Sequence, residues 1–409
     1  MVGATPATSH IRSPSEQVAL DAQSARTALS AFFLFGLLMS FPGAILPAWG
    51  YHLRDDFTEV GGYFLALAAG LLVSVRVGNF VLGRRTVRDA VVFGCALASV
   101  SFLGLALASP PAHFAWRVAG ILLIGVSAGL INSGAFQALS GLYARDKAAT
   151  VNMAGVLFGS GCLAMALIGS STFYVYTVSS TLILVALIPA FAAGLYRRAA
   201  FAAGEAPAVV SWRDVWVEVR SPGAVLFTAL LFFQFGNEWT AAAWIPIYLV
   251  QTIGTSPESS LAMLAGFWFC LFAGRVIAQV LLSRVGHGKI LVGSAAAALF
   301  GCLVLWATNN RFGAWTGIAM MGLGFSPIYP LVVERIGHRF PEYHPGFFNG
   351  LLSLGTAGGL LAPWMLGLLA DVWGIRTVVL FPFIGTILVF VLILLIWLEA
   401  RLTGSQARR

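Results

Sequence analysis

The feature that most constrains this chain is a series of apolar stretches, each long enough to cross a lipid bilayer. A helix needs roughly 20 apolar residues to span about 30 Å of hydrocarbon. Of the 409 residues, 59% are hydrophobic and 10% are charged, whereas soluble domains carry about 25% charged residues. We therefore predict an all-α integral membrane protein with twelve transmembrane helices, at about residues 28–53, 60–83, 89–109, 114–142, 149–172, 175–196, 222–252, 259–284, 289–308, 312–334, 345–370 and 375–400.

The basic residues predict the orientation of these helices, because cytoplasmic loops are enriched in Lys and Arg. With the N-terminus inside, four arginines fall on the outer side: Arg54, Arg117, Arg311 and Arg376. The cytoplasmic side receives Arg12, Arg26, Arg84, Arg85, Arg88, Arg145, Lys147, Arg197, Arg198, Arg213, Arg220, Arg284, Lys289, Arg335, Arg339, Arg401, Arg408 and Arg409. We expect a multi-pass protein of the cell inner membrane with both termini in the cytoplasm. The net charge of +8 follows from this topology and does not indicate a nucleic-acid partner.

The two halves of the chain resemble each other. Gly120 and Gly125 precede Gly317 and Gly322 by 197 positions, and Phe35-Gly36 precedes Phe235-Gly236 by 200. This register predicts two six-helix repeats, as in transporters built by duplication. We expect a leader over 1–26, a first half over 27–197, a linker over 198–221, a second half over 222–401 and a tail over 402–409. The leader lacks the pattern of a cleavable signal peptide, and Ser13-Pro14 predicts the start of a short interfacial helix there.

Two Gly-rich, basic turns lie at equivalent places in the halves. The first runs from Gly78 to Arg84-Arg85, and the second leads from Gly274-Arg275 to Arg284 and Lys289. They resemble the signature that major facilitator transporters carry after their second and eighth helices, although the first copy is shortened and lacks an Asp. The resemblance implies a major facilitator fold. The alternative is that these turns are ordinary cytoplasmic loops enriched in basic residues. The predicted gating residues are Arg76, Arg84, Arg85, Arg275 and Arg284.

Three stretches are similar to the fucose/proton symporter branch of that superfamily. The first span contains Phe32 to Gly36, followed by Pro47. The seventh contains Gly236 and Glu238, followed by Trp244 and Tyr248, and the tenth contains the run Gly322 to Pro330. The resemblance implies a sugar transporter whose tenth helix is broken by a Pro-aromatic-Pro turn. Two acidic positions used by fucose permeases for proton coupling and sugar binding correspond here to Gly43 and Asn132. The proton chemistry of that branch therefore does not transfer directly.

Glu238 is the acidic residue that lies deepest in a predicted span. An ionised carboxylate there costs several kcal/mol unless it is paired or faces a water-filled cavity. Protonation and release on alternate sides would make Glu238 a proton-coupling group, and permanent neutralisation by a neighbour is the alternative. Arg76 and Arg275 also lie inside spans, but toward the cytoplasmic side, where a gate is expected.

Polar and aromatic side chains around Glu238 predict a sugar-binding face. Residues spaced three and four apart share one face of a helix, which groups Gln234, Asn237, Glu238 and Trp244 and turns Trp239 away into packing. Amides and carboxylates bind hydroxyl groups, and aromatic rings bind the apolar face of a pyranose; for each amide, an interhelical hydrogen bond is the alternative. The predicted substrate-binding residues are Gln234, Asn237, Glu238, Trp244, Tyr248, Asn132, Gln137, Tyr329 and Asn349.

Other chemistries find little support. The four cysteines stand singly in apolar stretches, so neither a disulfide framework nor a zinc site is expected. His338, Glu342 and His344 read as a solvated loop and not as a metal site, and the glycines of 355–359 lack the Lys-Ser/Thr of a phosphate loop. We expect no enzyme, no metal and no cofactor.

The first hypothesis is a monomeric secondary transporter that imports a monosaccharide, a hexose, with protons as the driving ion and the lipid bilayer as its solvent. Alternating access would rock the halves about a midplane site. An exporter of amphipathic small molecules is the alternative within transport, and the polar face of the seventh span argues against it. A membrane sensor that passes no cargo is the third hypothesis; the lack of a sizeable soluble domain counts against it.

Overall fold

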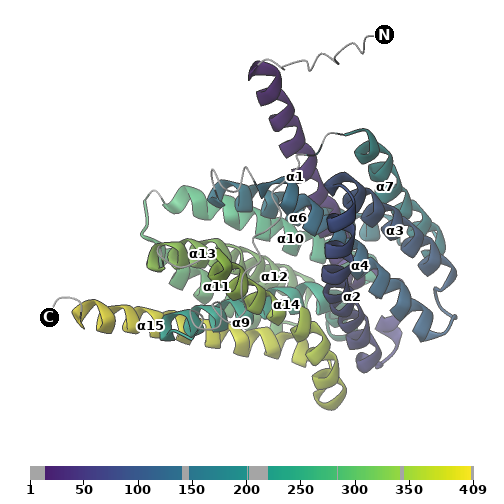
Figure 1. The fold of residues 1–409 in the computed structure, drawn as a ribbon. Helices are drawn as coiled ribbons and strands as arrows, with labels where there is room; N and C mark the ends of the chain where they lie inside the picture. The colour runs from purple at the N-terminus through teal and green to yellow at the C-terminus, as the bar shows by residue number, and fades with distance from the viewer. Residues whose placement is uncertain are drawn as a thin grey trace, which may run out of the picture.

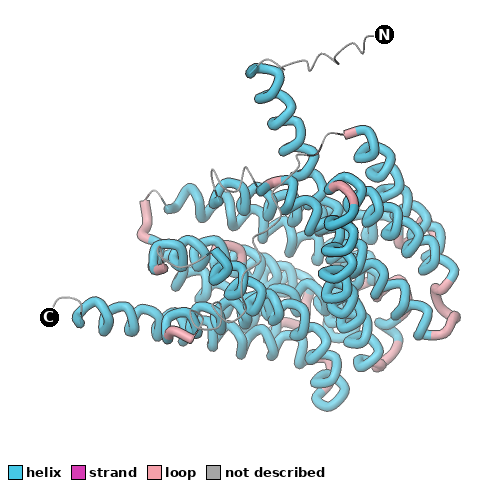
Figure 2. The backbone as a smooth tube through the Cα atoms, in the orientation of Figure 1, coloured by secondary structure: helices cyan, strands magenta, loops and turns pink. Residues whose placement is uncertain are grey.

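The protein is an all-helical bundle in the part of the chain that the computed structural model describes, residues 14–140, 147–199, 201, 220–282, 284–340 and 345–406. These residues contain no strand (Figure 2). The first half holds α1 (Pro14–Ile45), α2 (Phe57–Arg84), α3 (Val87–Leu107), α4 (Phe114–Ala138), α6 (Lys147–Thr172) and α7 (Val178–Arg198). The second half holds α9 (Pro222–Tyr248), α10 (Pro257–Leu282), α11 (His287–Ala307), α12 (Arg311–Phe325), α13 (Ile328–Arg339), α14 (Pro345–Trp373) and α15 (Thr377–Gln406).

Eleven of the described helical segments are long and apolar enough to cross a membrane, with α12 and α13 together forming one of them. The helix α9 is also long enough, at 27 residues, and its central Gln234, Asn237 and Glu238 lower its hydropathy. With α9 included, the structure agrees with the twelve predicted spans.

Both ends of the first helix differ from the predicted boundaries. The helix α1 starts at Pro14 and runs without interruption into the first span, so the predicted boundary at residue 26 is not a break in structure; Figure 1 shows α1 projecting from the bundle toward the N-terminus. It ends at Ile45 instead of residue 53. A turn that includes Gly50, in the left-handed conformation (φ 80°), then leads into a short 3-10 helix, η1 (Tyr51–Leu53). The tenth span is broken between α12 and α13 at Ser326-Pro327, as the resemblance implied.

The two halves repeat one packing pattern. In the first half α1 packs on α6, α2 on α4 and α3 on α7, and in the second half α9 packs on α14, α10 on α12 and α11 on α15. Between the halves, α2 packs on α14 while α10 packs on α6. Each half therefore contributes the equivalent pair of helices to the interface, which is the arrangement of a pseudo-two-fold repeat.

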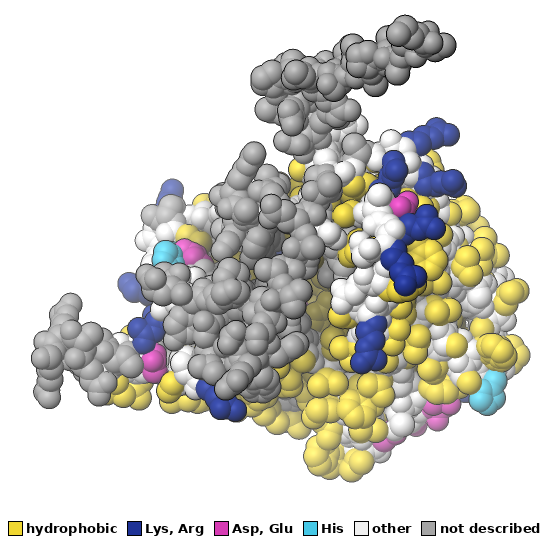
Figure 3. All heavy atoms as spheres, in the orientation of Figure 1, with side chains coloured by type: hydrophobic (Ala, Val, Ile, Leu, Met, Phe, Trp, Pro, Cys, Tyr) yellow, Lys and Arg dark blue, Asp and Glu magenta, His cyan; other side chains and the backbone are white. Residues whose placement is uncertain are grey.

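The ends of the helices define two faces. We call the side that carries the first turns of α1 and the last turns of α15 the terminal face, and the side that carries the turns at residues 46–56 and 374–376 the far face. Figure 1 shows the two groups of helices diverging toward the termini and meeting where α2 reaches α14. In Figure 3, most of the Lys and Arg side chains lie along the margins from which the two termini leave.

Hydrogen bonds close the halves against each other at the far face. Between described residues, the Asp371 carboxylate on α14 accepts from the backbone N–H groups of Phe57 and Thr58, each at 3.1 Å. The side-chain amide of Gln251 donates to the Arg54 carbonyl at 3.0 Å. The hydroxyl of Ser170 on α6 donates to the Glu258 carbonyl on α10, also at 3.0 Å.

Glycines let the helix backbones touch at this closure. A Cβ on Gly367 of α14 would lie 2.6 Å from the Phe57 carbonyl oxygen and 2.8 Å from the Cα of Gly61 on α2. Small residues allow such an approach, and membrane helices are held together mainly by close packing and hydrogen bonds. The far face is therefore closed by backbone contact as well as by hydrogen bonds.

Candidate functional site

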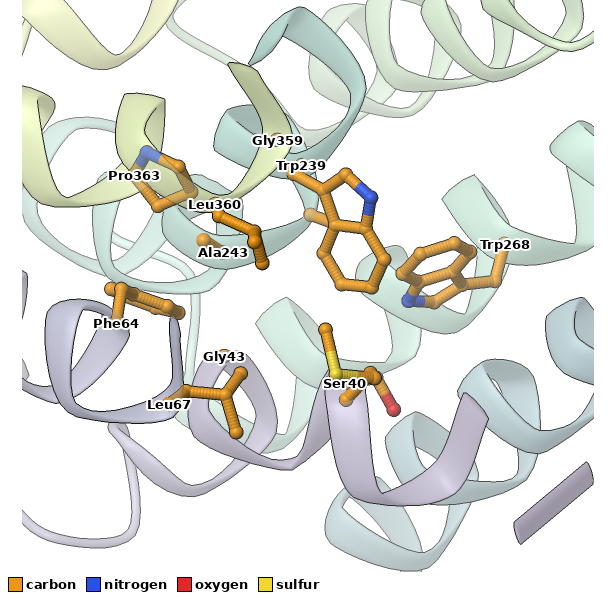
Figure 4. Close-up of a pocket in the computed structure, with 12 residues that line it drawn as sticks. Ser40, Gly43, Phe64, Leu67, Trp239, Ala243, Trp268, Gly359, Leu360 and Pro363 are labelled. Atoms are coloured by element: carbon orange, nitrogen blue, oxygen red, sulfur yellow. The ribbon is translucent and has the colours of Figure 1, made fainter. Parts of the chain in front are cut away.

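Two cavities lie between the halves, on either side of the middle of α9. Cavity 1 is lined by Met39, Ser40, Gly43, Phe64, Leu67, Trp239, Ala242, Ala243, Trp268, Gly359, Leu360 and Pro363 (Figure 4). Cavity 2 is lined by Gly155, Val156, Phe158, Gly159, Glu238, Trp268, Leu271, Phe272 and Arg275. Each cavity has room for one or two water molecules at its centre.

The helix α9 brings Glu238 to cavity 2. Its N-terminus is fixed by Ser221, whose hydroxyl accepts from the Ala224 N–H, with Pro222 in the first turn. Glu238 follows sixteen residues later and is only 6% exposed. Gln234, one turn earlier, interacts with its carboxylate. A carboxylate that is buried this deeply needs a cation or a proton.

Arg275 on α10 supplies a cation near that carboxylate. Its guanidinium group lines cavity 2 with Glu238 and attracts the carboxylate electrostatically, although no ion pair within 4.0 Å joins these two described residues. The Nε atom of Arg275 is buried and has no partner among the described residues. Gly155 of α6 makes room for the guanidinium, since a Cβ there would lie 2.8 Å from Nη1.

Arg275 is one of the predicted gating arginines, and it lines the cavity that contains Glu238. Its gating role stays a prediction. The other predicted gating arginines are exposed and line neither cavity: Arg76, Arg84, Arg85 and Arg284. Arg84 stacks on the ring of Phe80 at 4.2 Å.

Two tryptophans form the aromatic wall of the site. Trp239 and Trp268 pack edge to face, with ring centroids 5.9 Å apart, and both line cavity 1. Trp239 packs against Phe158 and Trp268, as expected, and it also lines cavity 1, which was not expected. Gly359 of α14 makes its position possible, because a Cβ there would lie 2.5 Å from the Trp239 ring.

Three of the four residues predicted to share one face of α9 are buried and hydrogen-bonded to neighbouring helices: Gln234, Asn237 and Trp244. Tyr248, another predicted ligand on α9, is bonded in the same way. Gln234 donates to the Phe325 carbonyl at 3.2 Å, and Asn237 donates to the Thr386 hydroxyl at 3.4 Å. The indole N–H of Trp244 donates to the Pro363 carbonyl at 3.0 Å, and the Tyr248 hydroxyl donates to the Leu305 carbonyl at 3.2 Å. None of the four lines either cavity. In this conformation the amides of Gln234 and Asn237 therefore form interhelical hydrogen bonds, the alternative to sugar binding that was considered for them.

The predicted residues of the other spans are spread out. Asn132 of α4 is half-buried, with its Oδ1 atom buried and without a partner among the described residues. Tyr329 of α13 packs on Phe235 with ring centroids 5.0 Å apart, and Gln137 is half-buried. None of these lines cavity 1 or cavity 2. The side chain of Asn349, and residues Glu342 and His344, lie outside the described part of the chain.

Gly43 shows why one acidic position of the fucose branch is unfilled here. A Cβ at Gly43 would lie 2.8 Å from the Ala242 carbonyl oxygen of α9. A carboxylate at this position would therefore meet the backbone of the opposite half while the far face is closed. This contact could not be predicted from one sequence, because it joins residues about 200 positions apart.

Comparison with known proteins identifies the family. A family model described as Major Facilitator Superfamily matches residues 148–363 and 231–409, together more than half of the chain. The chain belongs to the Major Facilitator Superfamily. This result confirms the superfamily suggested by the Gly-rich basic turns, and makes the protein a multi-pass membrane transporter.

Relatives of this major facilitator protein are distant. A protein TsgA homolog of Buchnera aphidicola subsp. Baizongia pistaciae is 23% identical over 388 residues, covering 92% of this chain and 95% of the relative. A glucose/galactose transporter of Brucella abortus is 27% identical over 156 residues, which is 38% of this chain and 37% of that protein. These bacterial relatives imply the inner membrane as its location.

Solved structures share the fold of this transporter. A D-xylose-proton symporter superposes with a TM-score of 0.71 at 12% identity, covering 92% of this chain and 97% of the other. FucP in the outward conformation gives a TM-score of 0.58 at 17% identity, with coverages of 91% and 98%. The predicted fold, two six-helix halves of the major facilitator type, is thereby confirmed.

Trp268, Phe64 and Met39 are lining residues that the sequence did not single out. Each is an apolar or aromatic residue in the middle of an apolar span, and such residues pack against lipid or neighbouring helices far more often than they line a site. A lone Trp in the eighth span was the one available signal.

Proposed function

We propose that this major facilitator protein imports a monosaccharide, a hexose, by alternating access, with proton uptake and release at Glu238. The cargo class is supported by the relative named a glucose/galactose transporter and by the fold shared with a D-xylose-proton symporter. The coupling is supported by one observation that carries the proposal, the buried carboxylate of Glu238 in a cavity between the halves.

Glu238 and Arg275 together suit a proton-coupling site. Arg275 stabilises the ionised carboxylate by its charge, but at a separation beyond 4.0 Å that leaves room for a proton or a water molecule on the carboxylate. A change in the distance between α9 and α10 would alter this attraction, so the movement of helices and the protonation of Glu238 are linked.

The closed far face defines the direction in which the site can open. If the basic residues place the terminal face in the cytoplasm, the structure represents a conformation closed to the outside. Import would then require the far-face contacts of α2 with α14 to part while the halves rock about the central cavities. In that movement Asn132, Gln137, Tyr329 and the amides of α9 remain proposed ligands, and the terminal-face arginines remain proposed gating residues.

One observation favours the alternative function, an exporter of amphipathic small molecules. Cavity 1 is lined almost entirely by apolar side chains, with Ser40 as its one hydroxyl-bearing residue. The polar face of α9 that argued against an exporter lies in the core. An apolar cavity with two tryptophans accepts the flat face of a sugar and equally an aromatic compound.

Uptake by proteoliposomes separates these functions. Purified protein is reconstituted and offered radiolabelled D-glucose, D-galactose, D-xylose, L-fucose, uridine and an amphipathic cation such as tetraphenylphosphonium, with and without an inwardly directed proton gradient. We expect gradient-stimulated uptake of at least one hexose. Transport of tetraphenylphosphonium alone, driven by proton exchange, would establish the exporter and reject the monosaccharide proposal.

A further inference from the structure

Trp268 separates the two cavities. It is the one side chain that lines both of them, and it is only 2% exposed. On one side its ring packs against Trp239, and on the other side the cavity contains Glu238 and Arg275. Trp268 therefore stands between the apolar cavity and the charged one.

The indole N–H of Trp268 has no hydrogen-bond partner among the described residues. Figure 4 shows the nitrogen on the edge of the ring that is turned toward Ser40 in cavity 1. Buried N–H groups in proteins are almost always paired, and an indole nitrogen can only donate. By contrast, the N–H of Trp244, buried as completely, is used by the Pro363 carbonyl. The unused donor of Trp268 needs an acceptor that enters the cavity.

We infer that Trp268 is a cargo-binding residue whose indole N–H donates a hydrogen bond to a hydroxyl oxygen of the cargo. The inference rests on the proposed function and deepens it by naming a donor in the site. A hydroxylated ring that stacks against Trp239 places its edge oxygens at the level of Trp268, because the two indoles are packed edge to face. Ser40, which is buried and donates to the Leu37 carbonyl at 3.3 Å, can accept a further hydrogen bond from the same cargo.

The position of Trp268 also gives it a part in coupling. Trp268 also forms part of the wall of cavity 2, which contains Glu238. A cargo molecule that binds its N–H and shifts its ring would therefore change the surroundings of the Glu238 carboxylate directly. No other lining residue has access to both cavities.

Binding of the panel used above to detergent-solubilised wild-type protein and to Trp268→Phe tests this role. Phenylalanine keeps an aromatic wall and removes the donor. We expect the dissociation constant of the transported hexose to rise about three- to tenfold, the scale of one neutral hydrogen bond. Trp306→Phe, a change at a side chain that is 54% exposed on α11, is the matched control and should bind as the wild type does.

A series of deoxy analogues of the same hexose identifies the acceptor. The analogue that lacks the accepting hydroxyl should bind wild type and Trp268→Phe equally, whereas the other analogues keep the difference. If Trp268→Phe is not folded by size exclusion, the benzothienyl analogue of tryptophan at position 268 keeps the bicyclic shape and removes the N–H. Equal hexose binding by the wild type and a folded variant overturns the inference alone. A wild type that binds nothing in the panel overturns the proposed function and this inference with it.

Discussion

The carboxylate of Asp371 caps the helix that begins at Phe57, although the two residues belong to different halves. It accepts hydrogen bonds from the backbone N–H groups of Phe57 and Thr58 and from the Thr58 hydroxyl. Asp56, the residue at the N-cap position of α2, makes no such bond with its own side chain. The first turn of α2 therefore depends on α14 for its cap, and separating the halves at the far face leaves those N–H groups without it.

Replacing Asp371 by Ala should favour opening of the far face. Loss of a capping side chain costs about 0.5–2 kcal/mol, which corresponds to a two- to thirtyfold shift between conformations. Spin labels at Val175→Cys and Phe312→Cys, both well exposed at the far face, would report the separation of the halves as a distance distribution in a background without the four native cysteines. Asp55→Asn, at an exposed neighbour, is the control, and an unchanged distribution in Asp371→Ala would contradict the capping role.

Replacing Gly367 by Ala should also oppose closure, but by steric conflict. The added Cβ would lie 2.6 Å from the Phe57 carbonyl oxygen, so α2 and α14 have to move apart. Gly104→Ala is the matched control, since nothing lies within 4 Å of a Cβ at that position. We expect Gly367→Ala to lower transport at least tenfold and to lengthen the distance between the spin labels. Normal transport with an unchanged distance would show that the contact is not needed.

Glu238→Gln tests the proton role. Glutamine resembles the protonated acid, so exchange of internal for external sugar should survive, while accumulation driven by a pH gradient should be lost. Both are measured in proteoliposomes with the transported hexose. If Glu238 is chiefly a sugar ligand, the two activities fall together, and gradient-driven accumulation by Glu238→Gln would exclude the coupling role.

Arg275→Gln should resemble Glu238→Gln if the arginine acts through the carboxylate. Without the guanidinium, no cation lines cavity 2 in the described structure. We expect accumulation to be lost and exchange to be kept, and the double variant should be no worse than either single one, because residues that act as a unit are not additive. Arg197→Gln, at an exposed arginine of α7 that lines neither cavity, is the control. If the losses add up in the double variant, Arg275 does not act through Glu238, and the two residues have independent roles.

Trp244→Phe should affect stability more than binding. Trp244 is fully buried, its ring packs near Phe57 and Phe64 of the other half at centroid distances of 6.2 Å, and its N–H is bound to Pro363. We expect a lower unfolding temperature and a dissociation constant for the hexose within about twofold of the wild type. A selective loss of binding in a variant of normal stability would restore the stacking role predicted from the sequence.

The fold was predictable because each span is long and strongly apolar, and lipid requires every backbone group to be paired within a helix. The ends of the helices were less predictable. Pro14 starts a helix that continues into the first span, and that helix ends at Ile45, before the apolar run does. At the site, the depth of Glu238 was visible because an acid in a membrane span is costly. The orientation of its neighbours was not, since it depends on which helix packs against each face of α9.

Trp239 and Trp244 illustrate that limit. Both lie on α9, and helical spacing assigned Trp244 to the cavity and Trp239 to packing. In the structure Trp239 lines cavity 1 as well as packing, because Gly359 of α14 leaves space beside it, while Phe57 and Phe64 of α2 cover Trp244. These contacts join residues far apart in the chain, and one sequence alone does not disclose them.

Glu238 and Trp239 are consecutive residues that face different cavities. Successive side chains on an α-helix are about 100° apart around its axis, and that angle is fixed by the backbone. A rotation of α9 as a rigid cylinder therefore moves the carboxylate and the indole through the same arc, and neither can leave its cavity while the other stays. In the proposed cycle, a rotation of α9 would therefore displace the proton-binding carboxylate of Glu238 and the ring of Trp239 together.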